Sequence, residues 1–194
     1  MKRILLIAAV TLMSVAASAQ DLKWAYVDFN QLVMLMPKTT EYIAVVEENQ
    51  NEQNETLSGM YEEYQVKMQE YQQKAQTWSA ATRESKEKEL MDFQSRFEMT
   101  QQSYQQELYE LKQNLMSELY EDAQKVVNNL AKEKGVAFVF AQSSLMYFDP
   151  AQGLDLTPDA RKALKISEDK TIESFEMELQ ANPAKANAAA VLLR

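Results

Sequence analysis

The sequence contains neither cysteine nor histidine, and it has only three glycines and four prolines in 194 residues. Without cysteine it can form no disulfide, and without both residue types it offers no thiolate or imidazole ligand for a metal. Nucleophile systems that depend on an imidazole base are excluded as well. Three glycines are too few for a phosphate-binding glycine-rich loop. A pair of carboxylates remains as a catalytic option, but nothing in the sequence places two of them in one pocket, so we expect no enzyme activity, cofactor or metal.

Proline is also missing from the whole stretch between Pro37 and Pro150, and glycine interrupts that stretch only at Gly59 and Gly135. The stretch is rich in Glu, Gln, Lys, Leu and Met, which favour helix. The sequence thus predicts a mainly helical protein whose helices are unusually long.

The first residues are typical of a secretory signal. Lys2 and Arg3 precede an apolar run over residues 4–13, and small residues follow up to Ala19. The alternative is a short membrane anchor, but the run is too short to span a bilayer. We therefore expect residues 1–19 to be a signal peptide, cleaved after Ala19, and the mature protein to be exported.

Basic residues are in the minority. Once Lys2 and Arg3 leave with the signal, 18 basic and 29 acidic residues remain, a net charge of −11. Such a chain is a poor partner for nucleic acid or for an anionic lipid surface, because both require basic patches. We therefore expect no nucleic-acid binding and no stable insertion into a membrane.

The proline-free stretch carries two regular apolar seams. Spacings of three and four residues run from Leu57 to Trp78 and again from Phe93 to Val126. We interpret them as two helices, at 39–78 and 83–134, that fold back on each other with a turn near residue 82. In the register that aligns most apolar positions, Tyr71 faces Phe93 and Tyr61 faces Tyr104. Thr39 or Thr40 would cap the first helix and Thr82 the second.

Short apolar segments flank these helices. Residues 24–29 predict a buried strand, and residues 30–36 a short helical turn. Residues 136–141 and 145–148 predict a β-hairpin, and Thr157-Pro158-Asp159 begins a short helix ending near residue 165. The tail after Pro183 is rich in alanine, and we expect it to be poorly ordered.

This order of parts resembles the Skp/OmpH family of periplasmic chaperones over residues 24–166. The resemblance rests on the Ala-Tyr-Val-Asp start at 25–28, the hydrophobic segment at 136–148 and the Leu-Asp-Leu-Thr-Pro segment at 154–158. It implies a homotrimer shaped like a jellyfish, in which strands form a central body and helical hairpins hang as tentacles. It also implies that unfolded outer-membrane proteins are held between the tentacles without ATP or another cofactor.

The expected fold class is therefore α+β, mainly α, with a long antiparallel coiled-coil hairpin on a small β-rich body that trimerises. Residues 20–38 and 135–166 form the body, 39–134 the tentacle, and 167–194 a partly disordered tail. One chain supplies too little core for such a body, so oligomerisation is the natural remedy. The residues expected to fill the shared core are Trp24, Tyr26, Phe29, Phe138, Phe140, Tyr147 and Phe148.

The charge of the tentacle departs from the family pattern. Well-studied members are basic with positive tips, whereas residues 41–76 here hold eight Glu and only Lys67 and Lys74. Residues 74–96, at the tip, carry a net charge of only +1. No basic motif matches a lipopolysaccharide site, so none is inferred.

Several apolar residues lie off the two seams. They either form an adaptable surface that contacts clients, or pack against neighbouring arms, or are simply scattered on the surface. These candidate client contacts are Met60, Val66, Met91, Met99, Tyr109, Met116 and Tyr120.

A hinge is expected within the first long helix. Residues 47–56 contain no apolar side chain, so Gln50 and Asn54 take seam positions, and Gly59 adds backbone freedom. Local stability should dip there, which would let the arms splay around clients of different size.

Three other interpretations remain. Asp149 and Asp155 flank a glycine-containing loop, but their spacing fits capping or turn roles better than calcium binding. The coiled coil could be a structural spacer that only sets a distance. The chain could also be an envelope assembly factor that docks on a membrane complex through residues 168–194.

Overall fold

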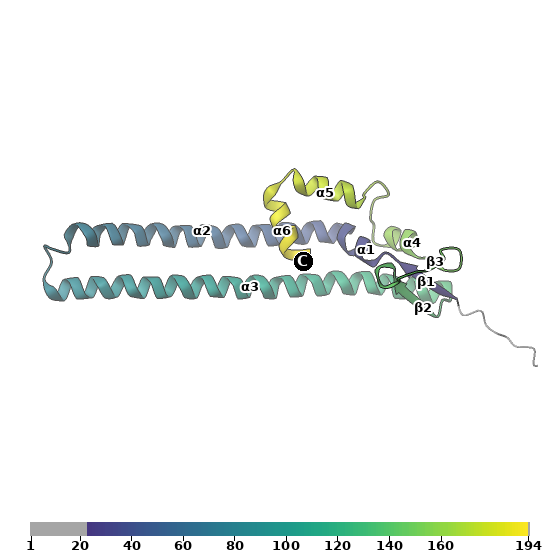
Figure 1. The fold of residues 1–194 in the computed structure, drawn as a ribbon, viewed down its shortest axis with the longest axis horizontal. Helices are drawn as coiled ribbons and strands as arrows, with labels where there is room; N and C mark the ends of the chain where they lie inside the picture. Colours follow the sequence, from purple (N-terminus) through teal and green to yellow (C-terminus); the bar gives the residue numbers. More distant parts are fainter. Residues whose placement is uncertain (1–22, 194) are drawn as a thin grey trace, which may run out of the picture.

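The computed structural model describes residues 23–193, so the signal peptide predicted for residues 1–19 lies outside the described residues. A long helical hairpin, hereafter the arm, extends from a small body that lies at one end (Figure 1). The arm consists of α2 (Pro37–Lys74) and α3 (Ala80–Lys134). The mainly helical α+β fold expected from the sequence is confirmed.

The body contains a three-stranded sheet in the order β2-β1-β3, made of β1 (Trp24–Val27), β2 (Phe138–Ala141) and β3 (Leu154–Asp155). Both β2 and β3 pair in parallel with the central strand β1. Side chains alternate between the two faces of a strand, and Ala25 and Val27 point into the buried core. Trp24 and Tyr26 therefore lie on the opposite face.

The β-hairpin predicted for residues 136–148 is wrong. After β2 the chain makes a 3-10 turn, η1 (Gln142–Ser144), and residues 145–148 form no strand. The position beside β1 is taken instead by β3, and Phe148 packs on the sheet face with its ring centroid 4.6 Å from that of Tyr26. Within residues 145–148, Phe148 packs on the sheet, whereas Met146 and Tyr147 are exposed to solvent. The apolar pattern of this segment therefore does not arise from strand pairing.

The body also contains two short helices. In α1 (Phe29–Leu35), the Asp28 carboxylate caps the N-terminus by accepting from the Gln31 N–H at 3.0 Å. The Asp28 N–H donates to Oγ1 of Thr157 at 3.0 Å, at the start of α4 (Thr157–Ala163). The first and last segments on which the resemblance rests therefore touch each other in space.

The ends of the arm helices differ from the sequence prediction. α2 begins at Pro37 after the cap position Met36, and Thr39 lies buried inside the first turn, where its hydroxyl donates to the Val33 carbonyl. α3 is capped by Ser79, whose hydroxyl accepts from the N–H of Thr82. It ends at Gly135, whose φ of 65° suits glycine.

The predicted register of the arm is wrong by one heptad. Phe93 packs against Tyr64, with ring centroids 6.0 Å apart, rather than against Tyr71. At the next level Gln53, not Tyr61, reaches Tyr104, donating to its carbonyl oxygen at 3.5 Å. The turn lies at residues 75–79, earlier than predicted, and a shift of seven residues leaves the 3–4 apolar pattern in place.

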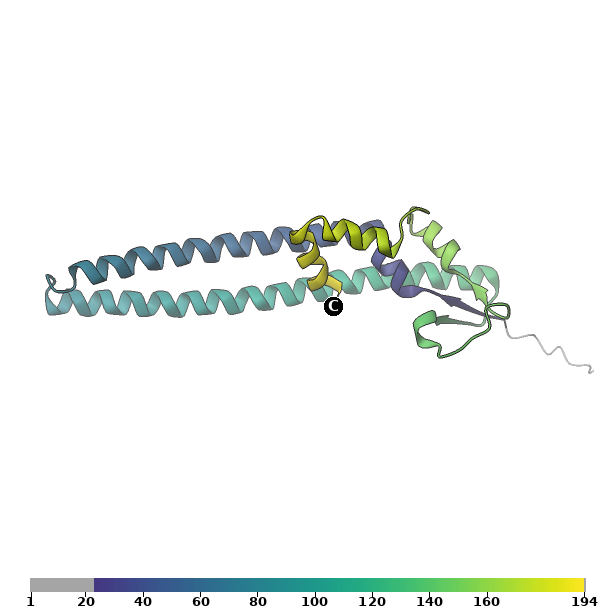
Figure 2. The ribbon, with the colours of Figure 1, turned by 45° about the horizontal axis from the view of Figure 1, so that its top comes forward.

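The C-terminal segment is helical, which corrects the expectation of a poorly ordered tail. α5 (Ile172–Gln180) and α6 (Pro183–Leu193) return along the arm, and α6 crosses it near the body (Figure 2). Phe175, Ala188 and Leu192 are buried in the main hydrophobic core. The small side chains of Ala188 and Ala189 permit close helix packing, although an alanine-rich segment was expected to be poorly ordered.

Candidate interaction surfaces

Asp149 and Asp155 both accept hydrogen bonds from nearby backbone N–H groups. Across residues 23–193, no three carboxylates gather in a way that would hold a metal ion. Asp149 accepts from the Ala151 N–H at 3.0 Å and Asp155 from the Thr157 N–H at 2.8 Å. These are the capping and turn roles expected for the two aspartates.

The arm exposes large apolar side chains along its length. Two helices cannot enclose a seam completely, so most apolar positions of the arm beyond its base stay half-buried or exposed. Among the candidate client contacts, Met60 and Met116 are half-buried, and the remaining five are exposed: Val66, Met91, Met99, Tyr109 and Tyr120. Their contact with a client is untested by the structure and stays a prediction.

The distal half of the arm also contains an open aromatic cleft of about 350 Å³. Tyr61 and Tyr64 of α2 and Phe93 and Phe97 of α3 line it, together with the amide of Gln94. Gln94 donates to the Tyr64 hydroxyl at 2.8 Å, and only Phe93 is fully buried. The apolar spacing places these aromatic residues in the seam, but it does not reveal that a two-helix seam leaves one side open.

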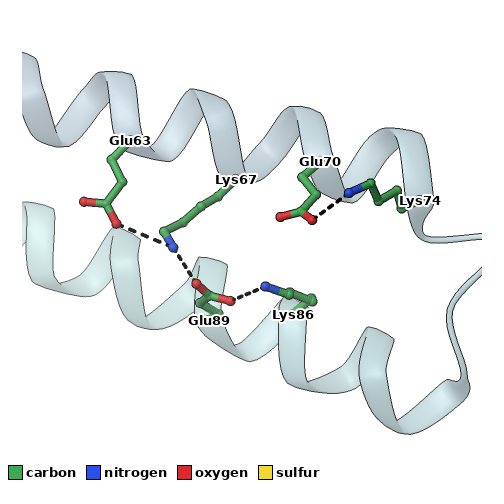
Figure 3. A network of polar contacts seen from close by, with 6 residues as sticks. All are labelled: Glu63, Lys67, Glu70, Lys74, Lys86 and Glu89. Atoms are coloured by element: carbon green, nitrogen blue, oxygen red, sulfur yellow. Dashed lines mark hydrogen bonds and ion pairs between the residues drawn. The ribbon is translucent and has the colours of Figure 1, made fainter.

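A network of charged side chains joins the two helices next to this cleft (Figure 3). Lys67 of α2 pairs with Glu89 of α3 and, at 3.5 Å, with Glu63, while Lys86 pairs with Glu89 at 3.0 Å. Hydrogen bonds from Lys67 and Lys86 hold the pKa of the Glu89 carboxyl at about 2, below its ordinary value of 4.5. The tip is thus held by charge pairing as well as by apolar contact.

A second network holds the base of the arm. Lys38 of α2 pairs with Asp122 at 2.7 Å and with Glu118 at 3.3 Å, both on α3. The hydrogen bond to Asp122 is the main reason that the pKa of Lys38 is raised above its ordinary range. The Tyr42 hydroxyl also donates to Glu118, so two side chains of α2 and two of α3 fix the register here.

One face of the body sheet is aromatic, and we call it the aromatic face. The register places Trp24 beside Phe138 and Tyr26 beside Phe140, and Phe148 packs on both β1 residues. Phe138 and Phe140 stack on each other with centroids 6.4 Å apart, yet they are 53% and 41% exposed. Parallel sheets usually have both faces covered, so this face has the character of an interface.

The other residues expected in the shared core lie apart from this cluster or only at its margin. Phe29 packs against Tyr120 of α3, with centroids 5.6 Å apart, at the base of the arm. Tyr147 is 86% exposed on the loop after β2, beside the fully exposed Met146. The exposure of Met146 could not be predicted from the sequence, and the geometry of the loop reveals it.

A groove of about 520 Å³ lies between α1, α3, α5 and α6. Two of the candidate client contacts, Met116 and Tyr120, line it together with Phe175 and Ala189 from the C-terminal helices. This groove could not be placed from the sequence, because the tail after Pro183 was expected to be poorly ordered.

The residues expected to form a hinge lie in an unbroken helix. Gln50 is half-buried, Asn54 is exposed, and a side chain at Gly59 would meet open space. Near them, the Oδ1 atom of Asn49 is buried without a hydrogen-bond partner. Continuous helix geometry neither tests nor removes a hinge, which stays a prediction.

Comparison with known proteins gives the family. The model of the outer membrane protein (OmpH-like) family matches residues 23–164, which is most of the chain. The chain belongs to the OmpH-like family. A relative of this chain is the chaperone protein Skp of Yersinia enterocolitica, 28% identical over 154 residues, which are 79% of this chain and 92% of that protein.

The OmpH-like match covers the body and the arm but ends within the loop after α4. The helices α5 and α6, which cover the base of the arm, therefore lie outside the part of the chain that matches the family. Between residues 23 and 193, no helix combines the length and apolarity needed to cross a bilayer.

Proposed function

We propose that this protein is a periplasmic holdase chaperone that binds unfolded outer-membrane proteins without ATP. The observation that carries the proposal is the arm itself, an elongated hairpin with large apolar side chains exposed along its length. Val66, Met91 and Met99 are examples, and flexible Met side chains repack around varied partners. Membership of the OmpH-like family and the name of the Yersinia relative support the same function.

The proposal includes a homotrimer assembled through the aromatic face of the body. Phe138 and Phe140 expose large rings on a parallel sheet, and burying them against two further copies would complete a core. Tyr147 and Met146, on the loop after β2, are exposed as well. Three arms hanging from one body would enclose a cavity in which a client is held.

The test measures aggregation of an unfolded β-barrel outer-membrane protein after dilution from denaturant, followed by light scattering. We expect the mature protein to suppress scattering at about one trimer per client, with no nucleotide present. A variant with Val66→Ser, Met91→Ser, Met99→Ser and Tyr109→Ser should lose much of this effect while keeping its helical content, because these side chains are exposed.

The same assay separates the other candidate functions. A structural spacer would leave the scattering curve unchanged at any ratio, which would refute the holdase proposal. An assembly factor would instead be retained on a membrane complex in a way that depends on residues 168–194, without suppressing aggregation.

A further inference from the structure

The C-terminal helices bury apolar side chains at the base of the arm, whereas the seam stays partly open farther along it. Ala188, Ala189 and Leu192 of α6 are buried, at 0%, 3% and 0% exposure, in the same apolar cluster as Ile43 and Val46 of α2. The cluster also includes Leu115 and Leu119 of α3. Figures 1 and 2 both show α6 crossing α2, with its C-terminal end directed toward α3.

Burial along the arm changes where this cover ends. The fully buried residues of α2 are Thr39, Ile43 and Val46, and from residue 47 to its end the helix has none. On α3 the same pattern holds, because between residues 80 and 114 only Phe93 is buried. The base is therefore a closed multi-helix core, whereas the distal arm is a two-helix pair with an incompletely enclosed seam.

Specific polar contacts attach the C-terminal helices to the body. The Arg161 guanidinium donates to the carbonyl oxygens of Ser167 and Lys170, at 2.8 and 2.7 Å, and to the side chain of Gln31 at 3.0 Å. Lys170 donates to the Thr40 hydroxyl of α2 at 3.2 Å. These bonds fix the start of α5 beside the start of α2.

The packing of α6 itself is light. Its buried side chains are mostly alanine, which contributes little apolar area, and the groove of about 520 Å³ remains open beside it. Asn182 caps the helix by accepting from the N–H groups of Ala184 and Lys185. Because little apolar area is buried, releasing α6 from its site costs less than releasing a helix with large buried side chains.

We propose that α5 and α6 form a clasp that closes the base of the arm, confines bending to the part beyond residue 47, and opens the base when α6 is released. The clasp is an addition to the OmpH-like part of the chain, since it lies beyond residue 164. The clasp also gives the predicted hinge a defined starting point. The polar stretch 47–56 begins directly after Val46, the last fully buried residue of α2. The consequence for clients rests on the proposed function, but the clasp itself does not.

Hydrogen exchange on the full-length mature protein tests the clasp without any client. We compare Ala189→Glu, which places a charge at a buried position of α6, with Asn187→Glu, which adds the same charge at an exposed position of that helix. In the unmodified protein, amides of residues 43–46 and 115–119 should exchange more slowly than those of 50–59. Ala189→Glu should speed exchange at 43–46 and 115–119 at least about tenfold and leave residues 85–95 unchanged, and Asn187→Glu should change neither.

Two results would overturn the clasp. Amides of α6 that exchange as fast as an unstructured chain in the unmodified protein would show that it does not dock. Unchanged protection at 43–46 and 115–119 in Ala189→Glu, with α6 exchanging freely, would show that docking does not close the base.

Aggregation assays with a small and a large β-barrel protein then test the consequence for clients. Ala189→Glu should improve protection of the large client relative to the small one, because the arms can open from their base. Equal protection of both by Ala189→Glu and the unmodified protein would overturn the link between the clasp and client size. Failure of the unmodified protein to protect either client would overturn the proposed function, while the exchange result still decides the clasp.

Discussion

Individual residues decide how the ends of the arm are held. Glu89 joins α2 to α3 through Lys67, and it is the one carboxylate of the tip network that also pairs with Lys86. Gly153 allows the loop before β3 to pass directly against the ring of Trp24 in the body. Substituting Glu89 or Gly153 should therefore change the stability of the protein in a way that the geometry predicts.

The pairing of Glu89 predicts a pH dependence of stability. Its pKa is lowered from 4.5 to about 2 by the hydrogen bonds from Lys67 and Lys86, so the ionised form favours the folded arm. This stabilisation is fully present above pH 4.5 and is lost as the pH falls through 2. Glu89→Gln should lower stability at pH 6 by only about 0.5 kcal/mol, since exposed pairs are screened, and the difference should vanish near pH 2.

Thermal unfolding followed by circular dichroism from pH 6 to pH 2 measures this difference. Glu84→Gln is the control, because Glu84 lies on the same helix and makes no ion pair in the described part of the chain. A Glu89→Gln difference that persists at pH 2 would mean that the carboxylate stabilises the tip in another way.

Gly153 should tolerate no side chain. A Cβ atom there would lie 2.6 Å from Cη2 of Trp24, whose ring is held by Tyr26, Phe140 and Phe148. We expect Gly153→Ala to destabilise the protein by about 1–3 kcal/mol in chemical denaturation. The matched change Gly59→Ala adds a methyl in open space within a helix, and should stabilise by about 0.5–1 kcal/mol.

At the scale of elements, the register of the arm can be tested with paired cysteines, because the chain has no cysteine of its own. Gln53 contacts the backbone of Tyr104 across the arm, so Gln53→Cys with Tyr104→Cys should form an intrachain crosslink on oxidation. Tyr61→Cys with Tyr104→Cys represents the register expected from apolar spacing and should crosslink far more slowly. Mobility on non-reducing gels distinguishes the two, and the opposite preference would refute the observed register.

Sequence patterns predicted the elements better than their pairing. The two long helices, the first strand and the helix after Thr157 follow from breaker-free composition, β-propensity and capping residues, all of which are local signals. The register was missed because a heptad pattern is unchanged by a shift of seven residues, so only the position of the turn, capped by Ser79, can settle it.

The sheet and the C-terminal helices were missed for a different reason. The pairing of β1 with β2 and β3 joins residues that are more than 110 positions apart, and no local pattern at 145–148 excludes a hairpin. In α6 the small size of Ala188 and Ala189 permits burial against other helices, yet an alanine-rich segment is also typical of a disordered tail. Of the candidate sites, the aromatic face could be predicted in part, and the groove beside α6 could not.

For the whole molecule, the aromatic face predicts the oligomeric state. Replacing Phe138 and Phe140 by Asp should place unpaired charge in the shared core and dissociate the proposed trimer. Sedimentation equilibrium measures the mass. The control is the double variant Val66→Asp with Met99→Asp, which adds two charges at exposed positions of the arm and should remain trimeric. A Phe138→Asp, Phe140→Asp variant of unchanged mass would place the interface elsewhere.

The parallel sheet has a consequence for the order in which the chain folds. β1 cannot pair with β2 until the whole of α2 and α3 has brought residues 24–27 and 138–141 together, which is a costly loop closure for a flexible chain. Helices form and zip locally from the turn at 75–79, and the completed hairpin replaces that long loop by a rigid connection. Refolding followed by fluorescence of Trp78 at the tip and of Trp24 in the sheet should therefore show Trp78 reaching its native signal first. Simultaneous changes at the two sites would mean that arm and sheet form in a single step.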